Sequence, residues 1–322
     1  MVVVLRSRPV TGRRWAKWLG HADLEGLERL AAAYTAGPDE AARARVSSEF
    51  SRILDDLCID GSWKRTLPRR LQRSESVLCR LLRADSPGEA LDVLDLGASD
   101  GITTVELLHA LRRAGMAGAR LHLADLTLTL HCYGAGALVE YRTARGEAVL
   151  ARLGRLGLRL PRSPRRFDGL STLLARLYLS LASIRARLQE TGTISLINPA
   201  VRAEPDLAAF EFNVLGRDDA LGGGFDAIRA SNVLNKENFT QNQLLCALGN
   251  LNAYLREGGY LLVSRSDIAA GEIERGSVWR RRGPGFIPVE DFGGGSEISA
   301  VVAAFTGPAP RRAAHPAGTE AG

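Results

Sequence analysis

The 322-residue chain carries a formal net charge of +6, with 45% hydrophobic and 24% charged residues. These values are typical of a globular protein and argue against a fibrous or wholly disordered chain. Aromatic residues make up 6% of the chain and do not alternate with basic ones, so we expect no nucleic-acid-binding platform.

Cysteine use and hydropathy narrow the expectations further. Four cysteines are widely spaced and form no C-x-x-C pair: Cys58, Cys79, Cys132 and Cys246. This pattern predicts a reducing compartment and no metal site. No stretch reaches the ~20 apolar residues of a membrane span, and the apolar run at the N-terminus is too short for a signal peptide. We expect a cytoplasmic protein.

The N-terminal part, residues 1–86, is predicted to be a helical cap. A basic patch with two tryptophans at 13–18 is expected to pack back on the protein rather than bind an anionic surface. Apolar residues then recur at helical spacing over 24–31, 43–58 and 74–83. We expect these helices to cover the sheet of the domain that follows.

A strand, a glycine turn and a helix follow in direct succession. The apolar run over 91–96 predicts a buried parallel strand, the turn GASDG occupies 97–101, and apolar residues recur at helical spacing from Ile102 to Leu111. Such a unit brings backbone N–H groups at a helix N-terminus to a nucleotide-like ligand.

Three ligand interpretations compete for this turn. A dinucleotide fingerprint requires glycines where Ser99 and Ile102 stand. The stretch also matches G-x-S-x-G, which would make Ser99 the nucleophile of an α/β-hydrolase. That enzyme would need one of the later histidines, which are His109, His122, His131 and His315. In the third interpretation, LDLGASDG at 94–101 resembles the first motif of the class I S-adenosylmethionine (SAM) methyltransferases, with Ser99 in place of the middle glycine.

Further strands end in polar residues. The second strand, 120–125, ends in Asp125, which lies 24 residues after Gly101, near the spacing of a ribose-binding carboxylate. A surface aspartate that caps the next turn is the alternative. The third strand, 207–214, ends at Asn213, and the fourth, 225–234, ends around Asn232.

A second set of motifs strengthens the resemblance. The succession FDAI, NVL, a helix over 239–256 and LREGGYLLV is similar to the later motifs of SAM methyltransferases. The resemblance covers roughly 90–305 without the insertion described below, and it implies SAM as the cofactor. Its cofactor-binding residues would be Asp95 (ammonium), Gly97, Ser99 and Gly101 (amino-acid part), Asp125 (ribose) and Asn213 (adenine edge).

The acceptor side is less defined. The resemblance implies that Asn232 lies near the transferred methyl group, which makes it the candidate catalytic residue. The alternative is that Asn232 is an ordinary turn residue at the end of its strand. Glu237 or a tyrosine of the insertion would serve as a general base if one is needed. For Asn213, the alternative to the adenine contact is that it is an ordinary turn asparagine.

An insertion separates the second strand from the third. Residues 128–200 are far more than one crossover helix requires, and we expect them to set substrate choice. They hold a glycine-rich bend near Tyr133, a basic loop at 159–166 and an apolar helical stripe over 168–189. We expect this helix to pack on its own protein, with a position on a membrane surface as the alternative.

These patterns predict a Rossmann-like α/β fold at 87–305: a mostly parallel seven-stranded sheet, an antiparallel C-terminal hairpin, the helical leader at 1–86 and a large helical insertion at 128–200. The tail, 306–322, is expected to be disordered. The function predicted is SAM-dependent methyl transfer to a small-molecule or lipid-like acceptor, with the oligomeric state left open. The alternative is a SAM-binding fold that no longer transfers methyl groups and acts as a binding or assembly partner.

Overall fold

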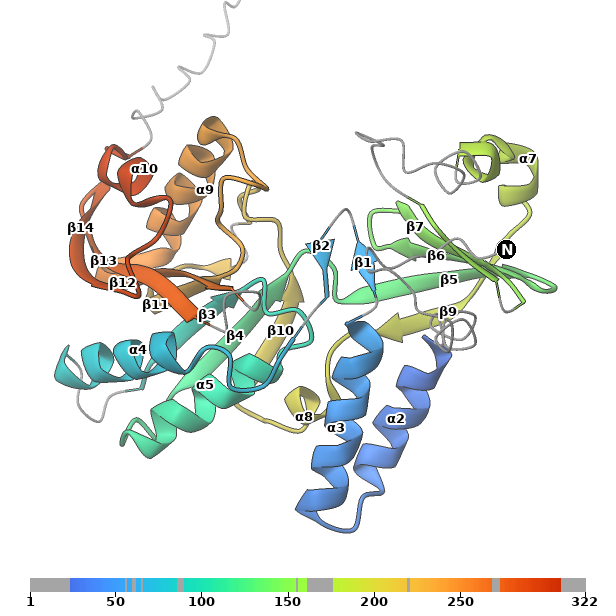
Figure 1. The fold of residues 1–322 in the computed structure, drawn as a ribbon, viewed down its shortest axis with the longest axis horizontal. Coiled ribbons are helices and arrows are strands. Elements are labelled where there is room, and N and C mark those ends of the chain that lie inside the picture. The colour runs from blue at the N-terminus through green and yellow to red at the C-terminus, as the bar shows by residue number, and fades with distance from the viewer. Residues whose placement is uncertain are drawn as a thin grey trace, which may run out of the picture. The chain divides into compact units, whose positions relative to one another are not determined.

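The computed structural model describes residues 24–55, 57–59, 62–64, 66–85, 90–154, 156–160, 176–218, 221–267 and 273–307. The basic patch at 13–18, most of the basic loop at 159–166 and the tail from 308 lie outside these residues. The chain divides into two compact units, Met1–Phe212 and Asn213–Gly322, which we describe separately (Figure 1).

The described strands confirm the predicted Rossmann-like sheet. The first unit supplies β3 (Asp92–Leu96), β4 (Arg120–Asp125) and β10 (Leu207–Glu211), all parallel. The second supplies β11 (Phe225–Ser231), β12 (Leu255–Asp267), β13 (Ile273–Arg282) and β14 (Gly285–Phe292). The seven-stranded sheet has the order β10-β4-β3-β11-β12-β13-β14, which in chain order is 3-2-1-4-5-6-7 and contains the doubly-wound order 3-2-1-4-5-6. β13 and β14 form the predicted antiparallel hairpin.

The described helices of the first unit match the predicted periodicity. They are α2 (Glu25–Thr35), α3 (Glu40–Leu54), α4 (Gln72–Asp85), α5 (Ile102–Arg113) and the short α8 (Pro199–Arg202). Asp39 caps α3 by accepting a hydrogen bond of 2.7 Å from the N–H of Ala42. Between α3 and α4 lies a hairpin that the periodicity did not predict, β1 (Cys58–Ile59) with β2 (Ser62–Trp63).

The insertion differs from the prediction, since most of its described residues form strands. These are β5 (Thr129–Ala135), β6 (Leu138–Thr143), β7 (Ala148–Leu153), β8 (Leu156–Arg159) and β9 (Gln189–Ser195). They form an antiparallel sheet in the order β8-β7-β6-β5-β9. The reason is the two-residue alternation along β5, where Leu130 and Cys132 are buried and His131 and Tyr133 are only half-buried.

The helical stripe predicted over 168–189 is only partly present. Residues 168–175 lie outside the described residues, 176–180 are helical, and α7 (Ala182–Arg185) follows after a break at Leu181. Leu177 and Ile184 are exposed, so part of the apolar stripe faces solvent. No helix of the described residues has the length and apolarity needed to span a membrane.

The leader helices α2 and α3 pack on the five-stranded sheet. They lie side by side, with the start of α2 and the end of α3 nearest the sheet (Figure 1). One buried cluster joins Leu27 and Phe50 of the helices to Leu130, Tyr141 and Ile194 of the strands. In the described residues these two helices therefore form a layer with the insertion.

In the second unit, α9 (Gln241–Tyr254) and α10 (Ser299–Ala303) accompany the strands. Helix α9 begins with a capping box, in which the Thr240 side chain and the Gln243 side chain each bind the other residue's backbone. Strand β11 is buried at all of its residues, as expected for a central parallel strand.

Candidate functional site

The turn between β3 and α5 has an unusual backbone. Gly97, Ser99 and Gly101 have φ values of 67°, 61° and 88°, all in the left-handed region that glycine adopts freely and other residues rarely do. The N–H of Gly97 donates to the carbonyl oxygen of Ala124 at 2.7 Å, which fixes the turn to the carboxyl end of β4. Ser99 is the one residue of the three that is strained there.

The Ser99 side chain lies in the interior. Ser99 is 5% exposed, and its Oγ has no hydrogen-bond partner among the described residues. Its backbone N–H donates to Asp125 Oδ2 at 2.8 Å. The turn therefore places an unsatisfied hydroxyl next to the predicted ribose-binding carboxylate, an arrangement that commonly indicates a functional site.

Asp125 has a partner that the sequence analysis missed. Its Oδ1 forms an ion pair with Lys64 Nζ, and Lys64 Nζ also donates to the carbonyl oxygen of Thr127 at 2.6 Å. The side chains of Lys64 and Asp125 are 9% and 12% exposed. The two charges are paired and largely shielded from solvent. Asp125 is therefore not a surface group, although its Oδ1 also accepts from the N–H of Thr127 at 3.4 Å, the kind of turn contact that the alternative interpretation named.

Asp95 and Gly101 hold the turn together. Asp95 is buried, and its Oδ2 accepts a hydrogen bond of 2.6 Å from the Thr104 hydroxyl, which joins β3 to α5. A Cβ atom on Gly101 would lie 2.2 Å from Leu123 Cδ1 and 2.7 Å from Val201 Cγ2. Packing against these side chains therefore requires glycine at 101, whatever ligand the turn binds.

A buried polar network ties the turn to the leader. Asp100 Oδ2 accepts hydrogen bonds from the Ser51 hydroxyl at 2.5 Å and from Asn198 Nδ2 at 3.4 Å. Asn198 also donates to the carbonyl oxygen of Ser47 at 3.0 Å and caps α8 through Ala200. Helix α3 is thus bound directly to the glycine turn, a contact across nearly 50 residues that local patterns do not reveal.

The remaining predicted residues belong to the second unit. Asn213 is exposed, and its Oδ1 accepts a hydrogen bond of 3.0 Å from the N–H of Leu215, which is the geometry of a turn asparagine. Asn232 has a φ of 63°, and its amide binds Ser266 twice: Oδ1 accepts from the N–H at 2.8 Å and Nδ2 donates to Oγ at 3.2 Å. Both atoms of the Asn232 amide therefore tie β11 to β12.

The candidate base Glu237 is not pre-arranged for proton transfer. Its side chain is 70% exposed and forms an ion pair with Arg265 at 3.0 Å. Both of its carboxylate oxygens accept hydrogen bonds of 3.0 Å from Arg265 Nη2. The structure therefore holds Glu237 as an ion-pair partner rather than as a positioned general base.

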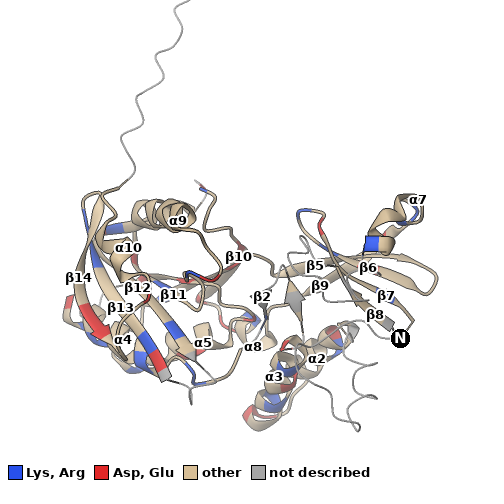
Figure 2. Cartoon of the chain, turned by 45° about the horizontal axis from the view of Figure 1, so that its top comes forward, with Lys and Arg blue, Asp and Glu red and all other residues tan. Residues whose placement is uncertain are grey.

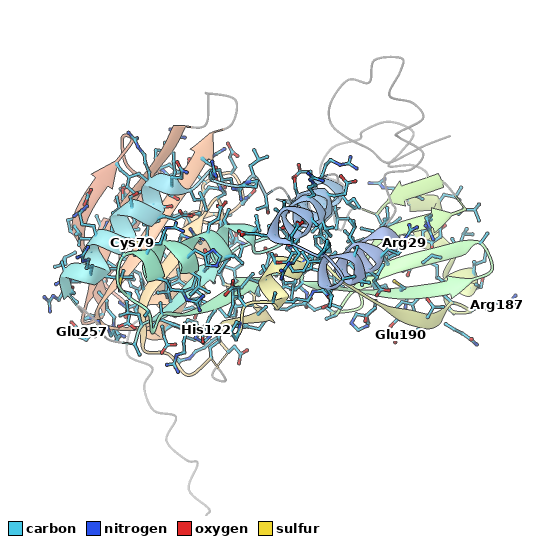
Figure 3. The ribbon with its side chains drawn as sticks, turned by 90° about the horizontal axis from the view of Figure 1, so that it is seen from below. Arg29, Cys79, His122, Arg187, Glu190 and Glu257 are labelled. Atoms are coloured by element: carbon cyan, nitrogen blue, oxygen red, sulfur yellow. The ribbon has the colours of Figure 1, made fainter. Side chains whose placement is uncertain are left out.

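The hydrolase interpretation fails in the part of the chain that is described. Ser99 Oγ has no histidine partner. His109 pairs with Glu204 at 3.0 Å, and His122 pairs with Asp92 at 3.2 Å. His131 pairs with Glu190, which is labelled on the five-stranded sheet in Figure 3, at 2.8 Å. His315 lies outside the described residues, so no described histidine is placed to activate Ser99.

The insertion contains a second charged cluster. Glu140 is fully buried on β6 and accepts hydrogen bonds from Arg142 at 2.5 Å, Tyr178 at 2.7 Å and Arg185 at 2.7 Å. Burial raises the pKa of Glu140, but the hydrogen bonds from Arg185, Tyr178 and Arg142 outweigh it and leave the pKa below its usual value. Burial and the bond to Glu140 raise the pKa of Tyr178. The cluster fastens α7 to the sheet.

Lys64 and the Asp100–Asn198 contacts are the site residues that sequence reasoning missed. Lys64 is one of only three lysines in an arginine-rich chain, with Lys17 and Lys236. That rarity was the one signal available, and it does not by itself indicate a partner. The pairing with Asp125 joins residues that are 61 positions apart.

No family model and no curated protein matches the chain. The chain is similar to several solved methyltransferase structures. One is the CMeT domain of the citrinin polyketide synthase, with 17% identity, 76% of this chain and 48% of that chain covered, and a TM-score of 0.33. Another is the CurJ carbon methyltransferase, with 14% identity, 81% and 53% coverage and a TM-score of 0.35.

A third is SAM-bound CalS10, an amino pentose methyltransferase from Micromonospora echinaspora, with 15% identity, 59% and 48% coverage and a TM-score of 0.26. The chain spans about half the length of these structures. At these TM-scores the likeness decides nothing about activity. The strand order of the sheet identifies the fold as Rossmann-like.

Proposed function

We propose that the chain binds SAM at the glycine turn and transfers its methyl group to an acceptor. The observation that carries the proposal is the buried hydroxyl of Ser99, which has no hydrogen-bond partner among the described residues. It stands on a left-handed residue whose N–H binds Asp125. A ligand with a sugar and an amino-acid part would satisfy this hydroxyl and the adjacent carboxylate, so the residues present fit SAM.

The roles of the individual residues follow from their chemistry. Asp125 would accept hydrogen bonds from the ribose hydroxyls, since a carboxylate offers about four acceptor positions. Gly97 and Ser99 would bring the backbone to the amino-acid part, and Asp95 would attract its ammonium group. The roles of Asn213 at the adenine edge and of Asn232 near the methyl group stay predictions from the sequence.

Bound SAM supplies a methyl group that is already activated by its sulfonium. The protein then has to align the acceptor with that methyl group and keep water out. This chemistry requires no catalytic triad, and it requires a general base only for an acceptor that must lose a proton.

We propose a small-molecule or lipid-like acceptor. Basic and acidic side chains are interspersed within each unit in Figure 2, and many of the described arginines are paired with acids, as Arg112, Arg142 and Arg185 are. In the described residues this mixture of signs is not the single-sign stripe that a nucleic-acid backbone would favour. We place the protein in the cytoplasm on the basis of its separated cysteines.

The second candidate is a SAM-binding protein without transferase activity. The commitment of the Asn232 amide to Ser266 and the pairing of Glu237 with Arg265 favour it. Incubation of the full chain with methyl-labelled SAM and a panel of metabolite and lipid acceptors separates the two candidates. Label transfer supports the transferase, whereas stoichiometric SAM binding without transfer supports the binding protein. A chain that binds no SAM would contradict both.

A further inference from the structure

Lys64 is presented to Asp125 by a short hairpin. The N–H of Lys64 donates to the carbonyl oxygen of Leu57 at 2.9 Å, which fixes its backbone at the end of the β1–β2 hairpin. Lys64 is 7% exposed, and its ammonium binds both Asp125 Oδ1 and the carbonyl oxygen of Thr127. The hairpin therefore places one buried cation against the proposed sugar-binding carboxylate.

The ion pair retains hydrogen-bonding capacity. An ammonium has three donors, and the contacts of Lys64 with Asp125 and Thr127 use two of them. A carboxylate has about four acceptor positions, of which Lys64 and the N–H groups of Ser99 and Thr127 use three, the last at a long 3.4 Å. One donor of Lys64 therefore remains, together with one acceptor position on Asp125 Oδ2.

Three buried hydroxyls lie on the segments that carry this pair. Thr66, Ser99 and Thr127 are 2%, 5% and 1% exposed, and none of their hydroxyl oxygens has a hydrogen-bond partner among the described residues. Ser99 and Thr127 both bind Asp125 through their backbone N–H groups. Buried polar atoms in folded proteins are usually hydrogen-bonded, so these hydroxyls indicate a polar ligand.

We propose that Lys64 is a second sugar-binding residue, which forms with Asp125 a donor–acceptor pair for the ribose diol. A hydroxyl is both donor and acceptor. It can therefore donate to the free position of Asp125 while it accepts from the free N–H of Lys64. A ligand without that hydroxyl leaves two buried charged groups short of a partner, which makes the pair selective for ribose over deoxyribose.

This inference rests on the proposed SAM binding, and it is tested by ligand affinity without an activity assay. The probes are S-adenosylhomocysteine and its 2′-deoxy and 3′-deoxy forms, titrated into the full chain by calorimetry. Two bonds to charged groups predict that the unsubstituted chain loses about 100-fold in affinity for one of the deoxy forms. In Lys64→Met one of the bonds is gone, so the loss is expected to shrink to about tenfold. The matched control, Lys236→Met, changes an exposed lysine and should keep the full 100-fold preference.

A deoxy penalty that is equal in Lys64→Met and in the unsubstituted chain would overturn the inference and leave the proposed function intact. An unsubstituted chain that binds none of the probes would contradict the proposed function itself. Because Lys64→Met leaves Asp125 unpaired, thermal unfolding is measured alongside. Lys64→Arg keeps the charge and the ion pair but changes the donor geometry. The loss of affinity for the deoxy form should also shrink in this variant. An unchanged loss would argue against a contact between Lys64 and the sugar.

Discussion

Replacing Ser99 by glycine is expected to stabilise the ligand-free chain while it weakens ligand binding. A left-handed conformation costs a non-glycine residue about 1–2 kcal/mol, and glycine relieves that strain. Glycine also has more conformational freedom in the unfolded chain, which offsets about 0.5–1 kcal/mol of the gain. Removing a buried hydroxyl without a partner adds about 1–3 kcal/mol. We therefore expect Ser99→Gly to raise the free energy of unfolding by about 1–4.5 kcal/mol in total.

Ser99→Ala separates the two contributions. Alanine keeps the left-handed strain at φ 61° and removes only the hydroxyl, so it should stabilise the chain by the second contribution alone. Denaturant unfolding of the ligand-free chain measures both variants, and calorimetry with S-adenosylhomocysteine measures binding. Both variants should bind roughly fivefold more weakly, because a neutral hydrogen bond contributes about 1 kcal/mol. Reduced stability in both variants would show that the hydroxyl is satisfied by the protein, and unchanged affinity would show that no ligand uses it.

Three further predictions follow from buried contacts. Asp125→Asn should lower the affinity for S-adenosylhomocysteine more than tenfold. It should also destabilise the chain by about 3–5 kcal/mol, because it leaves the Lys64 ammonium without its counter-charge. A loss of stability with unchanged affinity would reduce Asp125 to a structural role. Asn232→Ala removes two hydrogen bonds to Ser266 and puts alanine at a left-handed φ, which together should lower the free energy of unfolding by about 2–3 kcal/mol. The denaturation midpoint should fall accordingly, and a midpoint equal to that of the unsubstituted chain would refute this. The pKa of Glu140 is lowered in the folded chain, so its contribution is complete above the unfolded pKa of about 4.3 and is lost as the pH falls through the lower folded value. Acid titration of Glu140→Gln by circular dichroism should show a weaker loss of stability below pH 4.3 or so, and an identical acid profile would contradict the assignment.

The parallel strands were predictable because each is a compact apolar run with a polar residue at its end. Leu94 and Leu96 of β3, and the fully buried β11, show the continuous burial of central parallel strands. The glycine turn was predictable from its spacing, since left-handed residues need glycine at 97 and 101.

The insertion was predicted with the wrong secondary structure. The apolar residues over 168–189 favoured a helix, and only 176–180 and Ala182–Arg185 are helical among the described residues. The alternation of Leu130 and Cys132 with His131 and Tyr133 was present in the sequence and indicates a half-buried strand. The longer helical stripe masked this shorter signal.

The polar contacts of the site were out of reach of sequence patterns. The pairs Lys64–Asp125 and Ser51–Asp100 join residues 61 and 49 positions apart, and nothing local distinguishes these side chains from surface ones. The hydrogen bonds of Asn232 to Ser266 arise only once β11 and β12 lie in register. Long-range pairing of this kind is a property of the folded sheet.

The central claim is that SAM binds at the turn between β3 and α5, beside Asp125. Calorimetric titration of the full chain with S-adenosylhomocysteine, repeated with Gly97→Val, tests it most directly. Valine cannot adopt the left-handed φ of 67° at this position without strain, so we expect one binding site per chain and a loss of affinity of at least tenfold in the variant. Equal affinity in Gly97→Val, or no binding by the unsubstituted chain, would contradict the claim.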